Sequence, residues 1–143
     1  MEKFYVCTKE RKKERKIPEH IIQNAKIEIQ SIFNNVSGVN FIMICSTDGF
    51  EITTLYKKNI FNQTKLAAVS SSLHAMVSAL MNELQLIKCQ SITLDAENGK
   101  AVLTSIPSSQ YPMIMVALTN KDILLGQLLH ALKKSSLVIS SFE

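Results

Sequence analysis

The sequence predicts an α/β (α+β) three-layer sandwich in the order α-ββ-α-βββ-α, built on a five-stranded antiparallel sheet. Two hairpin signals, Asp48-Gly49 and Asn98-Gly99, each join two β-rich runs, which makes most of the sheet antiparallel. Two other runs, Phe41–Cys45 and Met113–Thr119, are apolar at successive positions. Because side chains alternate between the faces of a strand, both faces of these strands need a covering layer. A length of 143 residues suits one such domain.

The first element is an amphipathic helix. Pro18 and Glu19 suit its first turn, and Ser37-Gly38 suits its end. Its apolar residues recur at spacings of three and four and form one face, namely Ile21, Ile22, Ala25, Ile29, Ile32, Phe33 and Val36. Ile27 lies on the polar side. We interpret it as an ordinary exposed residue, with a partner anchor as the alternative.

The strands are expected to differ in burial. The two doubly apolar runs should be neighbours at the centre of the sheet, with the alternating strands outside them. Phe50–Tyr56 alternates apolar and polar residues and is expected to be half exposed. The last helix is expected to be capped by Asn120 or Asp122. Its apolar face comprises Leu124, Leu125, Leu128 and Leu132.

The middle helix, from about Gln63 to Leu86, is the informative element. A bulky stripe is expected to pack on the sheet, namely Leu66, Val69, Leu73, Val77, Leu80 and Leu84. Small residues dominate the opposite half, namely Ala67, Ala68, Ser71, Ser72, Ala75, Ser78, Ala79 and Asn82. Such a face lets another backbone approach closely, so we predict that it meets the same helix of a second subunit across a two-fold axis. The alternative is an exposed helix that simply tolerates small residues.

The residues carry little sign of catalysis. Ser70–Ser72 lie beside His74 but in mid-helix, away from the strained turn that a nucleophilic serine occupies. The three histidines form no metal-binding motif, and no phosphate-binding glycine motif occurs. The acidic residues at the hairpins are interpreted as turn formers and solvated strand ends, namely Asp48, Glu51, Asp95 and Glu97. We therefore predict no catalytic, cofactor-binding or metal-binding residue, and no enzyme.

The charge is concentrated at the N-terminus. Residues 1–16 carry seven basic and three acidic side chains, a net charge of +4, and residues 17–143 are neutral overall. We predict a basic flexible leader at 1–16 and a single domain at 17–143. The neutral domain argues against specific nucleic-acid binding. A weak contact of the leader with an anionic surface is the alternative to a solubilising tail.

The cysteines and the lack of export signals indicate a cytoplasmic protein. Cys7, Cys45 and Cys89 are an odd number at wide spacings without a CxxC motif, which suits a reducing compartment. The sequence contains no secretory signal and no apolar run of membrane-spanning length.

Three segments together resemble the Roadblock/dynein light chain family, particularly its prokaryotic members. They are Ser46–Ile52 (STDGFEI), Lys65–Met76 (KLAAVSSSLHAM) and Ser91–Ile106 (SITLDAENGKAVLTSI), and the similarity covers roughly Ile17–Ile139. The resemblance implies a Roadblock/profilin-like fold and a non-enzymatic homodimer. Its third strands, here Gln90–Ala96, would join edge to edge, with the second helices antiparallel across the two-fold axis.

Two sets of residues form the expected dimer interface. The helix contributes Ala68, Ser71, Ser72, Ala75, Ser78, Ala79 and Asn82. The strand contributes Gln90, Ser91, Ile92, Thr93 and Leu94. The resemblance further implies an adaptor that binds and regulates a small Ras-like GTPase. The alternative is a structural dimerisation scaffold in a signalling or motor-type assembly, without GTPase regulation. The basic leader and the loop Lys57–Asn59 depart from the family pattern.

Overall fold

The computed structural model describes residues 17–58 and 61–142. Its elements follow the predicted order: α1 (Glu19–Asn35), β1 (Val39–Ser46), β2 (Glu51–Tyr56), α2 (Gln63–Glu83), β3 (Ile92–Ala96), β4 (Gly99–Ile106), β5 (Met113–Thr119) and α3 (Leu125–Ser140). The basic leader predicted at residues 1–16 lies outside the described part of the chain. Among the described helices, none has the length and apolar character needed to cross a membrane.

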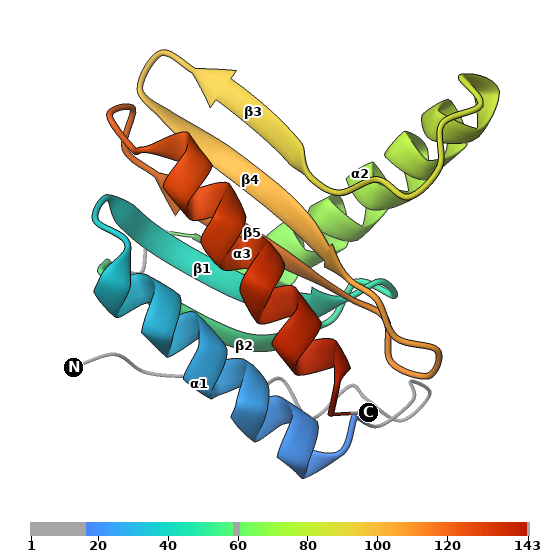
Figure 1. The fold of residues 1–143 in the computed structure, drawn as a ribbon, viewed down its shortest axis with the longest axis horizontal. Coiled ribbons are helices and arrows are strands. Elements are labelled where there is room, and N and C mark those ends of the chain that lie inside the picture. Colours follow the sequence, from blue (N-terminus) through green and yellow to red (C-terminus); the bar gives the residue numbers. More distant parts are fainter. Residues whose placement is uncertain (1–16, 59–60, 143) are drawn as a thin grey trace.

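The five strands form one antiparallel sheet in the order β2-β1-β5-β4-β3 (Figure 1). The two doubly apolar runs, β1 and β5, are neighbours at its centre, as predicted. The pairing aligns Met43 with Val116, and Val116 with Leu103, so one apolar row crosses three strands. Strands β2 and β3 are the two edges of this sheet.

Helices cover both faces of the sheet, and the apolar core is correspondingly divided in two. Figure 1 shows α1 and α3 side by side on one face, with α2 on the other. The first core cluster lies under α1 and α3 and includes Ile21, Ala25 and Ile29 of the predicted apolar face. The second lies under α2 and includes Phe41 and Ala67.

The two glycines of the hairpin signals serve different purposes. Gly49 has a φ of 97° in the turn between β1 and β2, where a residue with a Cβ would be strained. Gly99 instead pairs with Ala96 inside the sheet. A Cβ on Gly99 would lie 2.5 Å from the Thr119 carbonyl oxygen. The sequence placed this hairpin correctly. Glycine is needed at position 99 because β5 lies too close to leave room for a Cβ.

Two local predictions were wrong. Strand β2 was expected to be half exposed, yet its first five residues are buried. Helix α3 begins at Leu125, after Leu124, and neither Asn120 nor Asp122 is its N-cap. The loop before α3 therefore extends further than the capping pattern indicated.

Candidate protein–protein interface

Helix α2 is anchored at its start and by two hydrogen bonds to the sheet. The Asn62 side chain accepts a hydrogen bond of 3.0 Å from the Lys65 backbone N–H, which caps the helix. Ser71 Oγ donates to the Thr47 carbonyl oxygen at 2.5 Å, in the turn between β1 and β2. His74 Nε2 and Ser105 Oγ, on β4, are hydrogen-bonded at 3.2 Å. These contacts set the rotation of the helix about its axis.

That rotation differs from the prediction. The buried residues of α2 are Gln63, Ala67 and Ser70. Of the bulky stripe, Leu66, Leu73 and Val77 are half-buried. The other three members, Val69, Leu80 and Leu84, are exposed. The small residues Ala67 and Ser70 let the helix lie close to the sheet. The buried face is therefore centred about 60–80° away from the predicted one, at 100° per residue.

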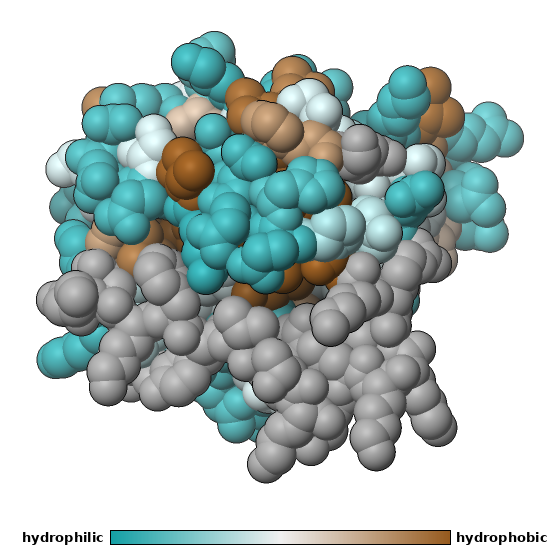
Figure 2. All heavy atoms as spheres, turned by 90° about the horizontal axis from the view of Figure 1, so that it is seen from below, coloured by the Kyte–Doolittle hydropathy of each residue, from teal (hydrophilic) through white to brown (hydrophobic). Residues whose placement is uncertain are grey.

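The rotation exposes large apolar side chains on the outer surface of α2. Val69 is 55% exposed, Met76 65%, Leu80 56% and Leu84 58%, so the expectation that the whole bulky stripe packs on the sheet was wrong. Helix α2 also projects beyond the sheet (Figure 1), and apolar side chains are visible on this projection at the right of Figure 2.

The apolar surface continues from α2 towards the edge of the sheet. Leu86 and Ile87 follow the helix and are 54% and 84% exposed, and Leu94 on β3 is 51% exposed. More than half of the exposed large apolar residues of the described chain lie between Val69 and Leu94. Concentrated exposed apolar surface of this kind is typical of protein–protein contacts.

Most of the predicted interface residues on α2 lie on the exposed surface. Those that are exposed and make no side-chain hydrogen bond to the described residues are Ala68, Ser72, Ala75, Ala79 and Asn82. Ser71 is partly buried by its bond to the turn, and Ser78 Oγ donates to the His74 carbonyl oxygen at 2.9 Å. We define the α2 surface as these five small or polar residues together with Val69, Met76, Leu80 and Leu84.

The predicted strand residues lie next to this surface. Gln90 and Ser91 are exposed and precede β3, which begins at Ile92. Ile92 is half-buried against the core under α2, whereas Thr93 and Leu94 are exposed. Within the described sheet, β3 pairs with β4 along one edge and with no strand along the other. An open strand edge offers backbone hydrogen bonds to another chain.

The sequence analysis missed the bulky part of the α2 surface because it assigned Val69, Leu80 and Leu84 to the core and left Met76 unassigned. The available signal was that α2 carries apolar or small residues around most of its circumference. A helix on the surface of a sheet buries only one side, so an apolar second side remains for another partner.

Two hollows of the described chain are lined by polar side chains. A groove of about 570 Å³ is lined by α2, the segment before β3, the end of β4 and α3. His74, Ser105, Lys88, Cys89 and Lys133 line it, but no carboxylate does. The hydrogen-bonded His74–Ser105 pair therefore lacks the acid that orients a catalytic histidine.

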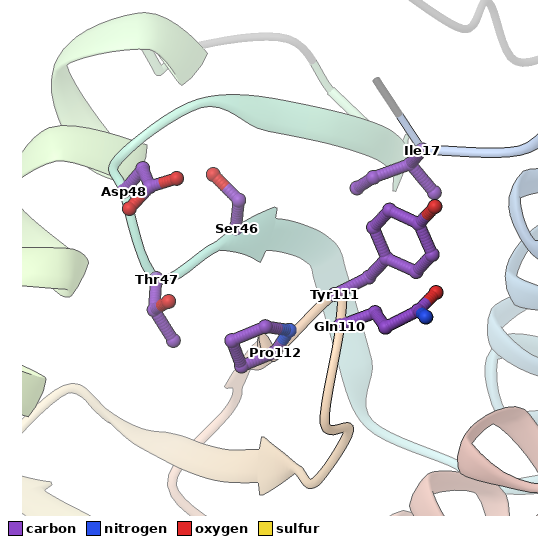
Figure 3. A pocket seen from close by; sticks show the side chains of 7 residues that line it. All are labelled: Ile17, Ser46, Thr47, Asp48, Gln110, Tyr111 and Pro112. Atoms are coloured by element: carbon purple, nitrogen blue, oxygen red, sulfur yellow. The ribbon is translucent and has the colours of Figure 1, made fainter. Parts of the chain in front are cut away.

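The smaller hollow, of about 50 Å³, lies at the turn between β1 and β2. Figure 3 shows Ile17 beside the Tyr111 ring, with Ser46 and Asp48 across the hollow. Among the described residues, no group of three or more His, Cys, Asp or Glu side chains is placed to hold a metal ion.

One acidic residue departs from its predicted environment. Glu51 was interpreted as solvated, but it is only 3% exposed and accepts a hydrogen bond from Thr54 Oγ1. It pairs in register with Cys45, which is fully buried. Burial, together with the smaller effect of the nearby Glu51 charge, raises the pKa of the Cys45 thiol to about 12.

The chain has the Roadblock fold, with a five-stranded antiparallel sheet and three helices, as comparison with solved structures shows. No protein-family model and no curated protein sequence matches the chain. The resemblance found in the sequence is thus confirmed for the fold.

Three of the similar structures illustrate the match. Myxococcus xanthus MglB has a TM-score of 0.78 and 12% identity, over 90% of this chain and 93% of that one. An MglB with a tetrameric arrangement has a TM-score of 0.77 and 12% identity, over 87% and 91%. The Roadblock/LC7 domain from Streptomyces avermitilis has a TM-score of 0.70 and 10% identity, over 79% and 92%.

Proposed function

We propose that the protein is a non-enzymatic homodimeric adaptor that binds and regulates a small Ras-like GTPase. The observation that carries the proposal is the exposed, largely apolar α2 surface on a Roadblock fold. Burying apolar surface is the main favourable term in association, so such a surface favours a protein partner over a small substrate.

The dimer is formed by two copies of α2. A two-fold axis near Ala75 brings the small residues of both helices together, where close approach is sterically allowed. The same axis places the Val69 end of one helix against the Leu80 end of its copy. The exposed bulky residues of the two helices then pack against each other at both ends of the central contact between small residues. Self-association is also supported by the tetrameric arrangement named for one of the similar MglB structures.

The edge of β3 provides the second contact of this dimer. The Roadblock resemblance implies that the third strands pair edge to edge, and β3 is an edge strand whose residues after Ile92 are exposed. Pairing two β3 strands would satisfy backbone groups that otherwise face water. It would also extend the sheet across the two subunits.

The GTPase as a partner is supported by the sequence resemblance to prokaryotic Roadblock proteins. We assign no individual GTPase-contact residue. The proposed regulation repositions the catalytic groups of the GTPase itself, so it needs no active site in this chain.

The experiment is a binding and hydrolysis assay with the small GTPases encoded beside the gene. Each GTPase, loaded with GDP or with a non-hydrolysable GTP analogue, is mixed with the purified full-length protein and analysed by size-exclusion chromatography with light scattering. We expect a complex that depends on the bound nucleotide. Single-turnover GTP hydrolysis is then measured with and without the protein.

The outcomes separate the two functions. A nucleotide-dependent complex or an altered hydrolysis rate supports the GTPase adaptor. A stable dimer that binds none of these GTPases and leaves hydrolysis unchanged contradicts it and favours the structural scaffold. A pull-down that recovers a coiled-coil or kinase partner would then identify the assembly.

A further inference from the structure

The groove of about 570 Å³ lies at the edge of the sheet, beside the start of β3. Helices α2 and α3 cover opposite faces of the sheet (Figure 1), so a groove that both helices line opens at the edge between them. None of its lining residues belongs to the α2 surface. Its volume is within the range of roughly 300–1,000 Å³ that is typical of ligand-binding sites. The groove is therefore a candidate binding site separate from the α2 surface.

Lysines give the groove a positive charge. Lys88, which precedes β3, and Lys133, on α3, both line it, and no described carboxylate does. Lys133 Nζ donates a hydrogen bond of 3.1 Å to the neutral side chain of Gln90. Neither lysine forms an ion pair with another described residue. Two ammonium groups without a described counter-charge favour a ligand that carries negative charge.

One wall of the groove is the end of β4, which lacks a described partner strand on one side. The pairing of β3 with β4 ends at Ile92 and Leu103, whereas β4 pairs with β5 as far as Ile106. Thr104 and Ser105, from this end of β4, line the groove. Among the described residues, no backbone hydrogen bond joins this end to the segment before β3. A strand without a partner on one side can pair with the backbone of an extended peptide.

Apolar side chains complete the lining. Pro107, directly after β4, and Leu137, on α3, both line the groove. Leu137 is 58% exposed, so much of its apolar surface is left uncovered by the described residues. A ligand with an apolar side chain would bury this surface on binding. The combination of charge, strand end and apolar surface fits a peptide better than it fits a small inorganic anion.

We propose that this groove binds an extended acidic peptide segment of a partner protein. The segment pairs with the end of β4, its carboxylates face Lys88 and Lys133, and a neighbouring apolar side chain packs on Leu137. Because side chains of an extended chain alternate between two directions, acidic and apolar residues should alternate in the segment. This inference does not rest on the proposed GTPase function or on the proposed dimer.

Titration of the full-length protein with defined peptides tests the proposal. The probes are short peptides with blocked ends, in which glutamate alternates with valine, leucine or phenylalanine. The matched control peptides carry glutamine in place of glutamate. Nuclear magnetic resonance of the isotope-labelled protein should show saturable shifts at Gln90, Ser105 and Leu137, with at least tenfold weaker binding of the glutamine peptides. No saturable binding up to about 1 mM, or equal binding of the two sets, would overturn the proposal.

Two paired substitutions separate the groove from general electrostatic attraction. Lys88→Gln with Lys133→Gln removes both groove charges, and Lys121→Gln with Lys134→Gln removes two exposed lysines that do not line the groove. The net charge changes equally in the two proteins. The first pair should raise the dissociation constant of the acidic peptides at least tenfold, and the second pair should change it less than twofold. Equal effects would overturn the proposal.

Two further measurements exclude other occupants of the groove. Inorganic phosphate, added in excess at constant ionic strength, should not displace the acidic peptides. Displacement would overturn the peptide proposal and indicate a site for a free anion. Sedimentation equilibrium of the Lys88→Gln, Lys133→Gln protein should match that of the parent. A tenfold weaker self-association would overturn the proposal and indicate that a second copy of the chain fills the groove.

Discussion

Thr53 and Thr54 are neighbours in β2 and are equally buried, but their hydroxyl groups are in different environments. Thr54 Oγ1 donates a hydrogen bond to the buried Glu51 carboxylate. Thr53 Oγ1 is buried and has no hydrogen-bond partner among the described residues. A buried hydroxyl without a partner loses its bonds to water and gains nothing in return. The same substitution at the two positions should therefore have opposite effects.

Thr53→Val should raise the free energy of unfolding by about 1 kcal/mol, because an unpaired hydroxyl is replaced by a methyl group of similar size. Thr54→Val should lower it by about 2 kcal/mol, because a buried carboxylate loses a donor. Urea denaturation of both variants at neutral pH measures the two values. Effects of the same sign would contradict this account of β2.

Cys45 should make stability depend on alkaline pH. The thiol pKa is raised from 9.0 to about 12 in the folded protein, first by burial and then by Glu51. Above pH 9 the unfolded chain loses this proton while the folded protein keeps it, so stability falls as pH rises from 9 towards 12. Between pH 8 and 10 the free energy of unfolding should fall by about 1.4 kcal/mol more than in Cys45→Ala.

Parallel urea denaturation of the two proteins at pH 8 and pH 10 isolates this contribution, since the other titrating groups are shared. Iodoacetamide labelling provides an independent check. Cys45 should remain unlabelled in the native protein at pH 8, because the reactive thiolate form is scarce and the side chain is inaccessible. Identical pH dependence of the two proteins would contradict the raised pKa of the Cys45 thiol.

At the scale of elements, α2 shows how an apolar pattern can be assigned to the wrong side. The bulky stripe and the small-residue face were both recognised in the sequence, and the larger residues were assigned to the core. In the structure, Ala67 and Ser70 face the sheet, and Val69 and Leu80 face solvent. Hydrophobic size alone does not decide the orientation when contacts such as Ser71 to Thr47 also act.

A charge on the α2 surface should weaken the proposed dimer. Ala75→Glu and Leu80→Glu each place a carboxylate in a contact that excludes water, where its desolvation is uncompensated. The dissociation constant should rise by at least a hundredfold, or about 2.7 kcal/mol. Sedimentation equilibrium of each variant measures this change.

Ile27→Glu on α1 is the matched control, because Ile27 is 62% exposed, close to the 56% of Leu80. It should leave the oligomeric state unchanged. Ser71→Arg is a poorer probe of this surface than Ala75→Glu, since it also breaks the hydrogen bond to the Thr47 carbonyl oxygen. If Ala75→Glu and Leu80→Glu sediment as the parent protein does, α2 is not the dimer contact.

At the scale of the whole molecule, the two sheet edges decide which assemblies form. A sheet with two open edges can pair β2 of one copy with β3 of the next, and such a head-to-tail contact need not close. In the described sheet the first five residues of β2 are buried, whereas β3 is exposed after Ile92. We therefore expect two copies to join through their equivalent β3 edges, which would produce a closed dimer.

The sequence by itself determined the order of the elements, both hairpins and the central position of β1 and β5. These features follow from local periodicity and turn chemistry, which act over a few residues. The small and polar residues of the exposed α2 surface were also identified, though Val69, Leu80 and Leu84 were assigned to the core.

Only the tertiary structure decided which side of α2 meets the sheet, and that Glu51 and the next four residues of β2 are buried. These outcomes depend on contacts between residues far apart in the chain, such as His74 with Ser105, which no local pattern records. Alternation of polar and apolar residues indicates a half-exposed strand only when one face is open. In β2 both faces are covered, so polar residues such as Thr53 and Glu51 are buried despite the alternating pattern.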